Sequence, residues 1–335
     1  MKRFFLIMLT AVVMLGGLTA CGSGAATRVP ALSDGASGDR SLRIVTTIFP
    51  EYDWVMKILG DDGVNAEVTL LLDNGVDLHS FQPTAEDILN ISTCDLFIYV
   101  GGESDEWVED ALGNAMNKDM VVIDLLDTLG DRVREEELIE GMEAGEEEEG
   151  EEEGPEYDEH VWLSLRNASL LVKAISDAII TLDPEHAQRY ADNTADYLTK
   201  LDALDAGYRE AVEAAPVRTL LFGDRFPFRY LTDDYGLSYY AAFAGCSAET
   251  EASFETVTFL ADKVDELDLK VVLTIEGTDH RLAETIVQNT KSSDQRILTM
   301  DSMQSVTARD IGNGATYLSI MRDNLDVLRG ALGVN

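Results

Sequence analysis

The sequence predicts an α/β protein of two lobes, each a mainly parallel sheet flanked by helices. Short β-branched runs alternate with amphipathic helical segments over residues 42–182, and the same alternation returns over 216–335. Between them, at 183–215, apolar and aromatic residues recur at spacings of four and three, which indicates one long helix. In parallel α/β sheets, binding sites gather in loops at the carboxyl ends of the strands.

The first 41 residues have the features of an export signal and a tether. A signal peptide is expected over 1–20, because basic residues are followed there by an apolar run. The sequence Leu18-Thr19-Ala20-Cys21 has the form of a bacterial lipobox. Cys21 is therefore the expected lipidated residue, and 21–41 are a lipidated tether rich in small residues. A lipid anchors a protein to a membrane without spanning it. We expect an extracytoplasmic protein anchored by lipid to the cell membrane.

The N-terminal lobe is expected over 42–182. Its predicted strands are 42–48, 66–72, 96–100 and 120–123. Thr84 with Asp87 three residues later forms a plausible capping box for one of its helices, and two further helical patterns cover 50–59 and 167–180. The glutamate-rich segment 135–159 has few apolar residues, and it is interpreted either as a weak collector of cations or as a solvated loop.

The long helix is expected over 183–215, where Asp183-Pro184-Glu185 supplies a cap and a proline at the first helical position. The C-terminal lobe then covers 216–335. Its predicted strands are 219–222, 238–242, 271–275 and 296–299, and its predicted helices are 254–267, capped by Ser253, and 314–332.

Composition limits the classes of function. The chain has 335 residues, 45% of them hydrophobic, and a formal net charge of −38. That length suffices for one large or two medium domains, and that charge argues against nucleic acid as a partner and suits a surface that attracts cations. Besides Cys21, the chain has only Cys94 and Cys246. They could form one disulfide, but we interpret Cys94 as a core residue and place Cys246 in a loop.

Two of the four histidines lie in loop-like stretches. His79 is followed by Ser80-Phe81-Gln82-Pro83-Thr84, and His160 stands in Asp158-Glu159-His160-Val161-Trp162-Leu163-Ser164. A neutral imidazole is a ligand for borderline cations such as zinc. His186 and His280 are interpreted as ordinary residues at the starts of helices.

These two stretches resemble the motifs H-x-[FY]-x-[PS]-[TS] and D-x-H-x-W-L-[SD] of the zinc- and manganese-binding solute-binding lipoproteins of ABC importers, the cluster A-I receptors. The resemblance extends from about residue 42 to the C-terminus. It implies two lobes joined by one long rigid helix, small lobe movement on binding, and metal ligands at His79 and His160. It also implies a ligand after the last strand, which Asp301 matches.

The third family ligand is where the sequence departs from the pattern. Aligning Phe228-Arg229-Tyr230-Leu231 with the family's aromatic helix puts Arg225 at that position, and arginine cannot ligate a cation. Asp224 is the first candidate replacement, with Arg225 as its neighbour outside the coordination shell. Three protein ligands plus water, or a ligand from Glu249, Glu251, Cys246 or Glu276, are the alternatives.

The resemblance implies a monomeric, non-enzymatic receptor that carries Zn²⁺, with Mn²⁺ as second choice, to an ABC permease and its ATPase. Two histidines favour zinc, whereas Asp301 and Asp224 would suit manganese. One rival is a surface-anchored metal-dependent hydrolase, although the sequence has no H-E-x-x-H and no G-x-S-x-G motif. The other rival is an adhesion or stress lipoprotein with a degraded site, which Arg225 would favour.

Overall fold

The computed structural model describes residues 41–60, 66–143, 156–247 and 251–334. The predicted signal, lipidated Cys21, Glu249 and residues 144–155 of the glutamate-rich segment lie outside these residues. Residues 40–335 form one compact unit. Among the described residues, no helix combines the length and the apolar character that crossing a membrane requires.

The N-terminal lobe contains a parallel sheet of order β2-β1-β3-β4. Its strands are β1 (Leu42–Thr46), β2 (Ala66–Leu70), β3 (Leu96–Tyr99) and β4 (Val121–Asp124). The helices of this part of the chain are α1 (Phe49–Leu59), α2 (Ala85–Thr93), α3 (Trp107–Gly113), α4 (Leu125–Leu129) and α5 (Leu165–Leu182). The capping box of Thr84 and Asp87 is present at the start of α2.

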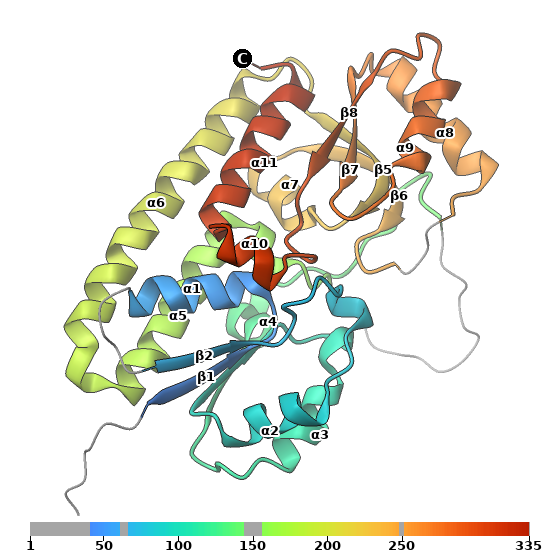
Figure 1. Ribbon diagram of the computed structural model, residues 1–335. Coiled ribbons are helices and arrows are strands. Elements are labelled where there is room, and N and C mark those ends of the chain that lie inside the picture. The colour runs from blue at the N-terminus through green and yellow to red at the C-terminus, as the bar shows by residue number, and fades with distance from the viewer. Residues whose placement is uncertain (1–40, 61–65, 144–155, 248–250, 335) are drawn as a thin grey trace, which may run out of the picture. The chain divides into compact units, whose positions relative to one another are not determined.

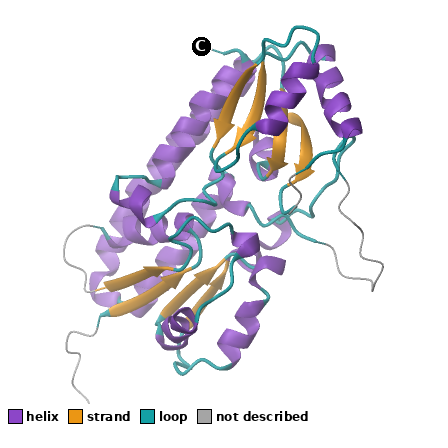
Figure 2. Ribbon diagram, turned by 45° about the vertical axis from the view of Figure 1, so that its right-hand side comes forward, coloured by secondary structure: helices purple, strands orange, loops and turns teal. Residues whose placement is uncertain are grey.

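The second sheet is also parallel and has the equivalent order β6-β5-β7-β8. Its strands are β5 (Thr219–Phe226), β6 (Ser238–Ala244), β7 (Val271–Ile275) and β8 (Arg296–Met300). The helices are α7 (Arg229–Tyr235), α8 (Phe254–Glu266), α9 (Arg281–Asn289), α10 (Ala308–Gly312) and α11 (Tyr317–Leu332). Figure 2 shows the two sheets as separate groups of strands with helices packed around each. The predicted two-lobe α/β fold is confirmed.

Helix α6 (Ala187–Ala214) spans 28 residues and contacts both lobes, packing on α1 and α5 and also on α11 (Figure 1). Its buried face carries Tyr190, Thr194, Tyr197, Leu201, Leu204 and Tyr208, the residues whose spacing predicted it. Pro184 lies in a separate short 3₁₀ turn, Pro184–His186, so the α-helix begins three residues later than the cap predicted. One short 3₁₀ turn therefore precedes the long connecting helix.

The lobes are also joined by buried polar contacts. The indole nitrogen Nε1 of Trp162 donates to the carbonyl oxygen of Ser302 at 2.8 Å, and the hydroxyl of Tyr317 donates to the carbonyl oxygen of Trp162 at 2.7 Å. The backbone N–H of Tyr317 donates to Asp53 Oδ2 at 3.1 Å. Trp162 and Tyr317 are fully buried, so these bonds hold the loop around residue 160 against the second lobe away from water.

Candidate metal site

His79 is presented by a short turn after β2. It is the middle residue of the 3₁₀ helix Leu78–Ser80. Its backbone N–H donates to Oδ1 of Asp77 at 3.1 Å, and this bond caps the turn. Its ring nitrogen Nδ1 lies 2.8 Å from Ser104 Oγ and 3.4 Å from Glu159 Oε2. With Nδ1 directed at these oxygens, the ring points Nε2 into the space between the lobes.

His160 is held by Asp158. One carboxylate oxygen of Asp158, Oδ1, accepts from both the backbone N–H and the ring Nδ1 of His160, each at 2.9 Å. This contact selects the tautomer that carries its proton on Nδ1 and leaves a lone pair on Nε2. The side chain is fully buried, and the short helix that follows, Val161–Leu163, is buried as well.

Cys246 follows the end of β6, in the second lobe. Its backbone N–H donates to Glu136 Oε1 at 2.8 Å, a contact from the segment that precedes the second histidine. The preceding residue, Gly245, lies directly against the His160 ring. Cys246 and Cys94 are both free thiols among the described residues, and Cys94 is buried in the core as predicted.

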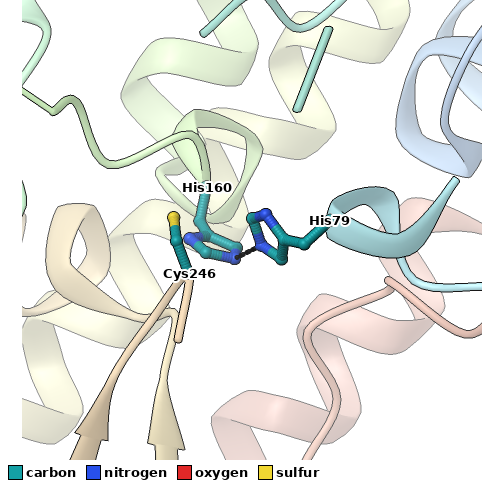
Figure 3. A group of neighbouring side chains, drawn as sticks. All are labelled: His79, His160 and Cys246. Carbon is teal, nitrogen blue, oxygen red and sulfur yellow. Dashed lines mark hydrogen bonds between the residues drawn. The ribbon is translucent and has the colours of Figure 1, made fainter. Parts of the chain in front are cut away.

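The three side chains converge. A ligand atom of each, a ring nitrogen of His79 and of His160 and the sulfur of Cys246, lies within 4.8 Å of the other two. Figure 3 shows the two imidazoles meeting edge to edge, with the thiol beside the His160 ring at the end of its strand. The Nε2 atoms are 3.3 Å apart. Because both Nδ1 atoms face oxygens, both Nε2 atoms would be available as ligands for one bound cation.

The pKa values of the three side chains are shifted in different directions. Burial, and then the neighbouring His160, lower the pKa of His79 to about 4, so this ring is neutral at physiological pH. Burial would lower the pKa of His160, but the Asp158 carboxylate outweighs it and raises that pKa. Burial raises the pKa of the Cys246 thiol well above its usual value. Because a metal binds the deprotonated thiol and imidazole, its binding to Cys246 and His160 would compete with protons.

Glu159 adds negative charge immediately behind His79. Its Oε1 accepts from the backbone N–H of Ser104 at 2.9 Å, while its buried Oε2 has no hydrogen-bond partner among the described residues and lies 3.4 Å from His79 Nδ1. Burial raises the pKa of this carboxyl. A cation on Nε2 of His79 would make Nδ1 more acidic and strengthen this contact.

Asp224, the first predicted replacement for the third ligand, lies in an irregular part of β5. The strand continues four residues past its predicted end, and its pairing with β6 shifts between Phe222 and Arg225. Asp224 Oδ2 accepts from Thr278 Oγ1 at 2.9 Å and from the backbone N–H of Ile275, and Oδ1 accepts from the backbone N–H of Arg225. Its carboxylate thus ties β5 to the loop after β7 instead of joining the group formed by His79, His160 and Cys246.

Asp301, which follows β8, and Glu276, which follows β7, form an acidic pair. Glu276 accepts from Ser302 N–H, Ser302 Oγ and Gln304 N–H, and Asp301 Oδ1 accepts from Met303 N–H. Burial, and then the Glu276 charge, raise the pKa of Asp301 to about 7. Asp301 lies outside the group of three ligand atoms, but its loop touches the His160 loop through Trp162 and the Ser302 carbonyl.

The remaining candidates lie outside the group formed by His79, His160 and Cys246. Glu251 lines a cavity of about 900 Å³ beside it, together with Asp77, Asp224 and Arg225. His186 and His280 each precede a helix, as expected. The contributions of Asp77, Ser104 and Glu159 were missed by reasoning from sequence. For Glu159 a signal existed in its place next to His160, whereas Ser104 meets His79 only through the fold.

Comparisons with known proteins agree with this fold. The family model described as ZnuA, zinc-uptake complex component A periplasmic, matches residues 44–331. The zinc-binding lipoprotein AdcA of Streptococcus pneumoniae is 31% identical over 305 residues, which are 89% of this chain and 57% of that protein. The chain thus spans little more than half the length of this relative. The high-affinity zinc uptake system protein ZnuA of Bacillus subtilis is 29% identical over 303 residues, 89% of each chain.

Solved structures show the same architecture. The zinc-bound ZnuA-like domain of Streptococcus pneumoniae AdcA has a TM-score of 0.68 at 27% identity, covering 88% of this chain and 99% of that one. The metal-dependent lipoprotein YcdH of Bacillus subtilis has a TM-score of 0.70 at 27% identity, covering 88% and 100%. Because the family match runs from β1 into α11 and includes the loops of His79, His160 and Cys246, this chain belongs to the ZnuA family.

Proposed function

We propose that this chain is a lipid-anchored extracytoplasmic receptor that captures Zn²⁺ and delivers it to an ABC permease and its ATPase. In this role it acts as a monomer that binds cargo without converting it. The observation that carries the proposal is the pair of Nε2 atoms 3.3 Å apart, with the Cys246 sulfur near both. The zinc-binding names of AdcA and ZnuA support the choice of cargo.

The proposed ligands are His79, His160 and Cys246, with a fourth position left for water or another donor. Zinc accepts this mixture of nitrogen and sulfur, whereas manganese prefers oxygen. The carboxylates that would have favoured manganese, Asp224 and Asp301, are engaged with backbone and hydroxyl groups. Cys246 therefore takes the role that the sequence first suggested for Asp224, and zinc is preferred over manganese.

The test is metal titration of signal-free protein after chelation, with zinc, manganese and cobalt. We expect one zinc per chain, tight enough to require a competing chelator, and much weaker manganese binding. His79→Ala and Cys246→Ser should each weaken zinc by about tenfold or more. Cys246→Ser should also abolish the sulfur-to-cobalt charge-transfer absorption of the cobalt complex.

Cys94→Ala is the matched control, because it removes the other thiol, which lies in the core. It should leave both the zinc affinity and the cobalt absorption intact. The proposal fails if the wild type binds zinc no more tightly than His79→Ala. Retention of the cobalt absorption in Cys246→Ser would remove Cys246 from the ligand set.

A further inference from the structure

Arg225 occupies the place where the family resemblance expects a metal ligand, and it contacts both lobes there. Its Nη2 donates to Asp77 Oδ2 at 2.7 Å, across to the N-terminal lobe. Its Nη1 lies 3.4 Å from the carbonyl oxygen of Ser247, the residue after Cys246. The two contacts use different nitrogens of one rigid, planar guanidinium, a geometry that an ammonium group cannot reproduce.

Both partners of Arg225 are attached directly to proposed ligands. Asp77 uses its other oxygen, Oδ1, to accept from the backbone N–H of His79 at 3.1 Å. Ser247 is joined by a peptide bond to Cys246. The side chains of Arg225 and Asp77 are 20% and 24% exposed, so the pair is partly shielded from water. One guanidinium thus connects the turn that carries His79 to the loop that carries Cys246.

We propose that Arg225 is a positioning residue that sets the distance between the His79 and Cys246 loops, with Asp77 as both its anchor and its neutralising charge. The inference rests on the proposed zinc site. A positive charge beside a cation site is unfavourable unless a carboxylate compensates it. The Asp77–Arg225 pair therefore holds the ligands in place at little electrostatic cost to the metal.

Three variants separate positioning from general stability. Arg225→Gln removes the connection and should weaken zinc about tenfold, mainly through faster dissociation. Arg225→Lys keeps the charge near Asp77 but loses the second contact, so it should recover only part of that loss. Asp77→Asn still accepts from the His79 N–H but leaves the guanidinium unpaired, and it should weaken zinc more than Arg225→Gln does.

The double variant gives a readout that a merely structural role would not produce. If the unpaired guanidinium repels the metal, adding Arg225→Gln to Asp77→Asn should restore part of the zinc affinity. Losses that simply add in the double variant would overturn the proposal. So would an unchanged affinity and dissociation rate in Arg225→Gln.

The control is Arg329→Gln. Arg329, with 37% of its side chain exposed, pairs with Asp326 of the same helix, α11, at 3.1 Å. It should leave zinc binding unchanged. An equal loss of zinc affinity in this variant would mean that Arg225 acts only through the stability of the fold. If the wild type itself binds no zinc at one per chain, the proposed function fails. If the wild type binds and only the Arg225 variants show no effect, the function stands and this inference fails.

Discussion

At the scale of single residues, Gly245 decides how closely Cys246 can approach His160. A Cβ built at this glycine would lie 3.0 Å from His160 Cε1 and 3.0 Å from the carbonyl oxygen of Phe226. The backbone side is rigid, so the imidazole would have to move. The ring is held by the bond between its Nδ1 and Asp158 Oδ1, so it can move only by weakening that bond.

We therefore expect Gly245→Ala to weaken zinc binding by roughly tenfold, since displaced ligands and their supports commonly cost that much. The measurement is competition with a chromogenic chelator. Gly113→Ala is the control, because no atom lies within 4 Å of a Cβ added there. Equal zinc affinity in Gly245→Ala and wild type would contradict the expectation that a methyl group at residue 245 displaces the His160 ring.

The residue scale also shows what sequence can predict about the site. His79 and His160 were predicted as ligands because each stands in a short local motif. Asp158 belongs to one of these motifs. Cys246 was only one of several alternatives, because its approach to the histidines depends on where β6 ends relative to the other lobe. Asp224 was favoured by its place in the chain, but the irregularity in β5 directs its carboxylate to Thr278.

At the scale of elements, α1 begins over a buried carboxyl group. Glu51 is fully buried, and its Oε2 accepts from the backbone N–H groups of Thr47 and Ile48 at 2.8 and 3.3 Å. Burial, and then the charge of Asp105, raise the pKa of Glu51 to about 8. Between pH 4.5 and 8 the unfolded chain releases this proton while the folded chain keeps it, so the free energy of unfolding falls as pH rises.

Glu51→Gln keeps an oxygen for the two N–H groups and removes the titration. Relative to wild type, its free energy of unfolding should rise between pH 5 and pH 8, by roughly 2 kcal/mol at the upper end. Denaturant titrations at several pH values measure this. Glu67→Gln, at an exposed position of β2, should show no such trend. A constant difference between Glu51→Gln and wild type across this range would contradict the assigned protonation.

Elements were the best predicted level, and the misses have physical causes. Hydrophobic periodicity located α6 and α11, and side-chain caps marked α2 and α8. The start of α6 was placed too early, because a proline that suits a first helical turn suits a 3₁₀ turn equally well. The extension of β5 to Phe226 was missed, because Gly223 and Asp224 weaken a strand pattern that pairing with β6 maintains.

At the scale of the whole molecule, the connection between the lobes limits their movement. Helix α6 contacts both lobes, and the buried bonds of Trp162 and Tyr317 cross between them. Opening the lobes like a hinge would leave these buried polar groups without partners. We expect small-angle X-ray scattering to give the same radius of gyration with and without zinc, to within about 1 Å. A decrease of several ångströms on zinc binding would instead indicate hinge closure.

The same arrangement would let a bound cation link the two lobes. Its three proposed ligands come from segments far apart in the chain and from both lobes, so no unfolded chain presents them together. A cation that binds only the folded state stabilises it by mass action, by about 4 kcal/mol when its concentration is a thousand times Kd. Without the cation, the protein would unfold more often and be more open to proteolysis than with it. The lifetime of the protein would thus depend on how much metal its surroundings supply.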